Sequence, residues 1–186
     1  IEPMIIVMPN AASEMYGFSF YTNSILNGNF EDFIVEDVVS YIDENYRTIN
    51  SPDSRSVMGN SQGGYAAIKL GMLHPDVFGV VASHSGLLYL DGVLALGEVV
   101  VSENPDGFIG PDPTKFLTSA GYAMSSAWSP NLNNPPFYVD LPFEYPSGAV
   151  IPEVRERWRA QDVFTMLDAN IFNFSSLKGV YMDAGT

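Results

Sequence analysis

The sequence Gly59-Asn60-Ser61-Gln62-Gly63 stands between a short apolar run and a helix-prone segment. A Gly-x-Ser-x-Gly at such a junction is typical of a nucleophile elbow, a tight strand-to-helix turn that lifts the serine hydroxyl into a cleft. The flanking glycines are expected because a side chain at either position would collide with the crowded backbone. Ser61 is therefore the candidate nucleophile, and the chain must place a strand before it and a helix after it.

The segments around this motif predict an α/β fold. The pattern predicts buried strands at residues 5–8, 55–58, 77–83 and 177–184, and helices at residues 30–50, 62–73 and 153–168. Asn29 is the expected N-cap of the first helix. Strands joined by helical crossovers pair in parallel, so we expect a mostly parallel sheet with helices on both faces. The elbow should lie at the carboxyl end of one strand.

Residues 87–152 interrupt this alternation. Nine of the 13 prolines fall between Pro105 and Pro152, interleaved with aromatic side chains, which predicts an irregular insertion ordered by packing. The length of 186 residues favours one domain, residues 1–186. Both ends resemble strands cut from a longer polypeptide, so the domain is expected to be incomplete at both ends, with missing parts of the same polypeptide completing the sheet.

The composition limits the classes of partner and of site. With 22 acidic and 8 basic side chains, the net charge of −14 predicts an acidic surface and disfavours nucleic acid or an anionic membrane as partner. No apolar run approaches the ~18 residues of a membrane span. The absence of cysteine excludes disulfides, thiolate metal sites and a cysteine nucleophile.

Only two histidines could activate Ser61 as a base. His74 is expected to close a helix at the surface, a full helix away from the elbow. His84 ends the strand that should neighbour the elbow strand, so it could line the cleft. In hydrolases with this elbow the histidine comes late in the chain, after the acid, and no histidine follows His84. Neither histidine has a metal-binding spacing, so no metal or other cofactor is predicted.

The residue after the nucleophile has a second expected role. The backbone N–H of Gln62 should form part of an oxyanion hole, supported by the positive end of the helix that begins there. For the substrate pocket, the sequence suggests Asn60, His84, Tyr89, Trp128 and Tyr138. The three aromatic residues in this set could equally form ordinary core within the insertion.

The elbow and its surroundings resemble the esterase D, or putative esterase, branch of the α/β-hydrolases. The resemblance rests on Gly59-Asn60-Ser61-Gln62-Gly63-Gly64-Tyr65, on Ile6-Val7-Met8-Pro9, and on His74-Pro75-Asp76-Val77-Phe78 followed by Ser85-Gly86. It covers residues 4–90 and 153–186. It implies the α/β-hydrolase fold and a serine esterase activity like that of feruloyl and acetylxylan esterases, S-formylglutathione hydrolases or mycolyltransferases.

The same resemblance implies that parts of the catalytic site lie outside these residues. The family's acid usually follows the glycine that corresponds to Gly185 by a few residues, and its histidine comes further downstream. Asp183 precedes that glycine and is interpreted mainly as a strand-end residue. The family's oxyanion loop, with a strand that would lie between residues 5–8 and the elbow strand, belongs upstream. The 186-residue chain alone is therefore expected to be inactive.

The sequence thus favours a serine carboxylic-ester hydrolase acting on a small-molecule or carbohydrate-linked ester through an acyl-enzyme on Ser61. Two alternatives stay open. One is a non-catalytic hydrolase-fold module that binds a ligand through the aromatic insertion, and the other is acyl transfer to a sugar or lipid alcohol. A secreted or periplasmic location is slightly favoured over a cytoplasmic one.

Overall fold

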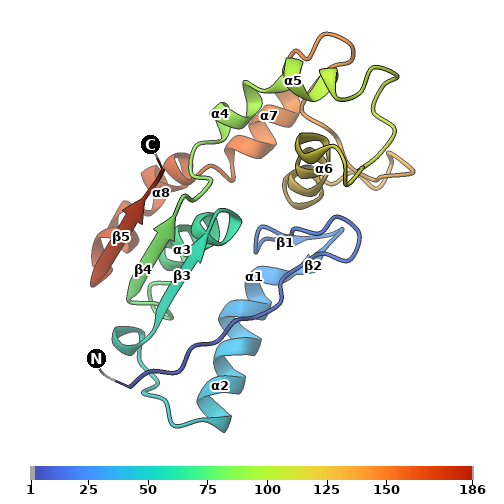
Figure 1. Ribbon diagram of the computed structural model, residues 1–186. Helices are drawn as coiled ribbons and strands as arrows, with labels where there is room; N and C mark the ends of the chain where they lie inside the picture. The colour runs from blue at the N-terminus through green and yellow to red at the C-terminus, as the bar shows by residue number, and fades with distance from the viewer. Residues whose placement is uncertain (1–2, 186) are drawn as a thin grey trace.

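Three parallel strands form the larger of the two sheets within the described part of the chain (Figure 1). In the computed structural model, which describes residues 3–185, they are β3 (Ser56–Asn60), β4 (Val80–His84) and β5 (Gly179–Asp183), in the order β3-β4-β5. The register aligns Asn60 with His84 and His84 with Asp183. The ends of all three strands therefore meet at one edge of the sheet.

Helix α3 (Gln62–Leu73) follows β3 directly and packs on β3 and β4. Gly71 lies so close to Val81 of β4 that a Cβ on the glycine would overlap the valine side chain. Val81 and Ser83 are buried under α3, whereas Met58 and Tyr181, on the opposite face, are exposed. Helix α8 (Val163–Ser176) packs against α3. The α/β-hydrolase-like architecture predicted from the sequence is thus present as a partial sheet with its helices.

The amino-terminal part differs from the prediction. Residues 5–8 form no strand, and Met8 is 88% exposed, so the strand predicted there is wrong. An apolar run becomes a strand only where a neighbouring strand accepts its hydrogen bonds, and none pairs with it within residues 3–185. A two-stranded ribbon, β1 (Asn23–Ser24) and β2 (Gly28–Asn29), lies before the first helix instead.

The first long helix is continuous but ends earlier than expected. It comprises α1 (Phe30–Asp32), a π-helical segment (Phe33–Val38) and α2 (Val39–Asn45). Asn29 makes no side-chain cap, contrary to the prediction; the Asn23 side chain accepts the N–H groups of Glu31 at 3.0 Å and Asp32 at 3.2 Å. A short 3₁₀ turn, Pro52–Ser54, leads into β3.

The segment predicted as an irregular insertion contains three helices: α4 (Leu90–Leu94), α5 (Gly97–Ser102) and α6 (Phe116–Trp128). The helix predicted at 153–168 is two helices, α7 (Pro152–Arg159) and α8, separated where Asp162 caps α8 by accepting the N–H groups of Phe164 and Thr165. Figure 1 shows α4 to α7 lying beyond the carboxyl ends of the strands. Helices α4 to α7 therefore lie at the edge of the sheet that carries Ser61.

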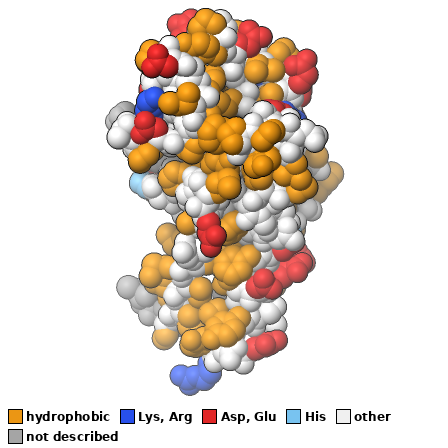
Figure 2. Space-filling model, turned by 90° about the vertical axis from the view of Figure 1, so that its right-hand side faces the viewer, with side chains coloured by type: hydrophobic (Ala, Val, Ile, Leu, Met, Phe, Trp, Pro, Cys, Tyr) orange, Lys and Arg blue, Asp and Glu red, His pale blue; other side chains and the backbone are white. Residues whose placement is uncertain are grey.

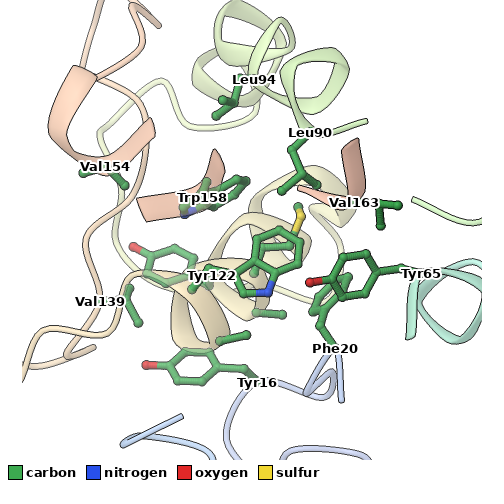
Figure 3. Packing of buried hydrophobic residues seen from close by; sticks show 14 of the residues in the cluster. Tyr16, Phe20, Tyr65, Leu90, Leu94, Tyr122, Val139, Val154, Trp158 and Val163 are labelled. Carbon is green, nitrogen blue, oxygen red and sulfur yellow. The ribbon is translucent and has the colours of Figure 1, made fainter. Parts of the chain in front are cut away.

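Helices α4 to α7 share their core with α3. Figure 3 shows Phe20, Tyr65 and Trp158 packed into one cluster, with Tyr122 from α6 and Leu90 from α4. Trp158 is fully buried, and its indole N–H donates to Ser129 Oγ at 3.0 Å. No helix within residues 3–185 combines the length and the apolar character that a membrane span requires.

Candidate active site

Ser61 occupies the turn between β3 and α3. Its backbone has φ 54° and ψ −117°, a conformation that non-glycine residues rarely adopt and that costs of order 1–3 kcal/mol. The Tyr65 N–H donates to the Ser61 carbonyl at 3.0 Å, so the helix begins immediately after the turn. The residue is exposed. This geometry presents the hydroxyl at the carboxyl edge of the sheet, as expected of an elbow.

The glycines around Ser61 have different surroundings. A Cβ on Gly59 would lie 2.7 Å from Gly63 Cα and still closer to the Gly63 carbonyl. A Cβ on Gly64 would lie 2.8 Å from Gly86 Cα and 3.0 Å from the His84 oxygen. A Cβ on Gly63 would meet nothing within 4 Å among the described residues. The steric reason predicted for both flanking glycines therefore holds for Gly59 and not for Gly63.

Gln62 is the first residue of α3. Its backbone N–H has no partner inside the helix, because the first four N–H groups of any helix lack one, and it lies at the positive end of a 12-residue helix. The Gln62 side chain is engaged, since its Oε1 accepts the Phe20 N–H at 3.4 Å. Phe20 and Tyr21 both have positive φ, 50° and 48°, so a strained loop lies against the residue that follows the serine.

Strand β4, which pairs with β3, holds the turn at Ser61 in place. The Ser61 N–H donates to the His84 carbonyl oxygen at 3.0 Å, and the Asn60 side chain donates to the same oxygen at 3.2 Å. His84 Nδ1 is hydrogen-bonded to Asp183 Oδ1. Asn60 and His84, both suggested for the pocket, thus lie directly beside Ser61.

Asp183 connects β4 to β5. Its backbone oxygen accepts the Ser85 N–H at 2.9 Å, and Tyr181 donates its hydroxyl to Asp183 Oδ2 at 2.8 Å. The hydrogen bond from Tyr181, together with that from His84, lowers the pKa of Asp183 below its ordinary value. The same carboxylate raises the pKa of Tyr181. Tyr181 was not anticipated from the sequence; its signal was the two-residue spacing to Asp183, which places both on one face of a strand.

His74 lies at the end of α3, as predicted, but its ring has a specific partner. His74 Nε2 is 2.9 Å from Glu31 Oε1, and Lys69 Nζ is 2.6 Å from Glu31 Oε2. Burial raises the pKa of Glu31, but the hydrogen bond from His74 and the charge of Lys69 outweigh it and bring the value to about 2. Lys69 is almost fully buried, and burial lowers its pKa against the opposing effect of Glu31. This cluster fixes α3 to the first helix.

The three aromatic residues suggested as pocket walls lie in different environments. Trp128 is buried in the core, with ring centroids 5.6 Å from Tyr65 and 5.2 Å from Trp158, so it supports α3 from within. Tyr89 is exposed and packs edge-on against Phe164. Tyr138 is partly exposed with φ 56°. None of these three rings packs against another within residues 3–185, and their role as pocket walls stays a prediction.

Two kinds of contact are absent within residues 3–185. The Ser61 hydroxyl has no hydrogen-bond partner there, and neither histidine ring is bonded to it. In the same range, no group of three or more His, Cys, Asp or Glu side chains is arranged to hold a metal ion. Within the same range, the candidate site consists of Ser61 in its turn, the N-terminus of α3, and the imidazole–carboxylate pair on β4 and β5.

Known proteins share parts of this chain. Esterase Rv1288 of Mycobacterium tuberculosis is 32% identical over 85 residues, which are 46% of this chain and 19% of that protein. The MPT51 antigen of Mycobacterium leprae is 51% identical over 39 residues, 21% of this chain and 13% of that protein. The matched segments thus span less than a quarter of the length of either relative.

The fold is shared with a solved hydrolase. The structure of FphF, a fluorophosphonate-binding serine hydrolase of Staphylococcus aureus, matches with a TM-score of 0.51 at 15% identity, covering 90% of this chain and 49% of FphF. The family described as Putative esterase matches residues 1–186, the whole of the sequence. The chain therefore belongs to the Putative esterase family.

Proposed function

We propose that Ser61 is the nucleophile of a serine carboxylic-ester hydrolase. The observation that carries this proposal is the backbone of Ser61, a non-glycine residue at φ 54° between β3 and α3. Strain of this kind persists only where the surrounding structure enforces it, and it concentrates at functional sites. Membership of the Putative esterase family supports the same reaction class.

The proposed reaction proceeds through an acyl-enzyme. Ser61 Oγ attacks the ester carbonyl, and the tetrahedral oxyanion is stabilised by the Gln62 N–H and the positive end of α3. The alcohol departs with a proton, leaving the acyl group on Ser61. Water then attacks the acyl-enzyme and releases the carboxylic acid. Small-molecule or carbohydrate-linked esters are the proposed substrates.

We place the catalytic acid and base outside the 186 residues. Within residues 3–185, His74 is engaged by Glu31 and His84 by Asp183, and neither ring is bonded to Ser61. A serine without a base keeps only the residual rate that the oxyanion hole and binding supply. The 186-residue chain by itself is therefore expected to turn over esters negligibly.

A fluorophosphonate probe on the full-length gene product tests the nucleophile. We expect covalent labelling at Ser61, located by peptide mapping, and its loss in Ser61→Ala. Ser56→Ala is the matched control, because Ser56 is an exposed serine at the opposite end of the same strand, and this variant should label like the wild type. A folded protein that never labels would contradict the proposal and favour the binding module.

Acyl transfer shares the first half-reaction with hydrolysis. Product analysis with competing sugar or lipid alcohols distinguishes the two: free acid as the main product supports hydrolysis, and a new ester supports transfer.

A further inference from the structure

We propose that His84 and Asp183 form a positioning pair that holds the Ser61 elbow in its reactive conformation. This inference rests on the function proposed for Ser61. Neither His84 nor Asp183 is the expected catalytic acid or base. The proposed role of the pair is to hold the backbone of the turn at Ser61.

The elbow is attached to His84 at two points. The Ser61 N–H and the Asn60 side chain both donate to the His84 carbonyl oxygen. Because Ser61 is strained at φ 54°, the turn would relax if this attachment moved. The position of the His84 backbone thus determines where the Ser61 hydroxyl lies.

Asp183 in turn holds the end of β4 at two points, one on His84 and one on Ser85. Its side chain is bonded to His84 Nδ1, and its backbone oxygen accepts the N–H of Ser85, the next residue after His84. Ser85 itself has φ 47°, so the end of β4 is also strained. The second carboxylate oxygen is held by Tyr181. These hydrogen bonds link the carboxyl ends of β3, β4 and β5 to one another and to Ser61.

The hydrogen bond between the His84 ring and Asp183 is a contact in this series that a side-chain substitution can remove. His84 is 63% exposed in its side chain, and burial alone does not hold the ring in place. A hydrogen bond to a carboxylate with a lowered pKa is what orients it. Because His84 acts on Ser61 through its backbone, the pair positions the nucleophile without taking its proton.

The test compares the rate of fluorophosphonate labelling at Ser61 in variants of the full-length protein. His84→Ala should label about tenfold more slowly, because small displacements of a reacting group are costly. His84→Asn should restore most of the rate, since its amide N–H can replace Nδ1–H as the donor to Asp183. The double variant His84→Ala/Asp183→Ala should label no more slowly than either single variant, His84→Ala or Asp183→Ala. Lys178→Ala, at the other end of the β5 segment, is the control and should match the wild type.

The outcomes separate this inference from the proposed function. If the wild type labels and His84→Asn is as slow as His84→Ala, the ring acts as a base or a steric wedge, and the positioning pair is refuted. Unchanged labelling in His84→Ala, or additive losses in the double variant, refutes it as well while leaving Ser61 as the nucleophile. A wild type that never labels overturns both proposals. Thermal unfolding of each variant shows whether a slow labelling rate reflects loss of the fold. If His84→Ala does not fold, the labelling rate of His84→Asn decides whether the pair positions Ser61.

Discussion

Gly59 and Gly63 flank Ser61 symmetrically in the sequence, but their surroundings in the structure differ. Gly59→Ala forces its methyl group against the backbone of Gly63, which cannot move away as a side chain could. We expect a loss of about 2 to 3 kcal/mol in the free energy of unfolding and a sharp fall in labelling at Ser61. Urea denaturation and the fluorophosphonate assay measure the two effects.

Gly63→Ala is the matched control for that substitution. Its Cβ meets nothing within 4 Å among the described residues, and alanine favours a helix over glycine by up to about 1 kcal/mol. We expect unchanged or slightly higher stability. Equal losses in the free energy of unfolding of the two variants would contradict the steric difference between Gly59 and Gly63.

The residues of the site differ in how far sequence alone could find them. Ser61 and Gln62 are predicted by a local motif, because the elbow is defined by consecutive residues. The contact between His84 and Asp183 joins residues 99 positions apart, and it depends on the β4–β5 register. The sequence predicted that both residues lie at strand ends of a parallel sheet. It did not predict that these two strands pair, and only this pairing makes the two residues neighbours.

At the scale of elements, local signals predict best where tertiary contacts agree with them. Helix α3 has the predicted bounds, since its strand, turn and helix are all set by adjacent residues. The prediction of a strand at residues 5–8 was wrong because strand pairing depends on residues far away in the sequence. Helix α6 was missed among the prolines and aromatic residues around it, although it is 13 residues long and nine of them are buried.

The cluster of Glu31, Lys69 and His74 ties two elements together and should make stability depend on pH. The pKa of Glu31 falls from its ordinary 4.5 to about 2 on folding, so its contribution is fully present above about pH 5 and is lost as the pH falls towards 2. Glu31→Gln should lose about 3 kcal/mol at pH 7, because it leaves the buried Lys69 ammonium unpaired.

Urea denaturation at several pH values between 7 and 3 measures this contribution. The wild type should lose stability over the acid range, and Glu31→Gln should show a flatter dependence. Glu36→Gln, an exposed acid in the same long helix, should follow the wild type. Parallel pH curves for Glu31→Gln and the wild type would contradict an ionised Glu31 as the source.

At the scale of the whole molecule, exposed apolar surface and high negative charge act in opposite directions. Figure 2 shows hydrophobic side chains gathered on one face among acidic side chains, with few Lys or Arg. Across the molecule, Ile6, Met8, Met58 and Phe172 are each more than 70% exposed. Such surface favours association, whereas the net charge of −14 keeps copies apart.

This balance predicts that the 186-residue chain associates as salt rises. Raising ionic strength from 0.01 M to 1 M shortens the Debye length from about 30 Å to about 3 Å, which removes the repulsion and leaves the apolar attraction. Sedimentation should therefore show a mass near 20.4 kDa at low salt and larger species at high salt. The variant Ile6→Gln/Met8→Gln should stay monomeric to higher salt, because it removes apolar surface at unchanged charge, while Ser54→Gln should behave like the wild type. Association that weakens with salt would instead indicate attraction between charged groups.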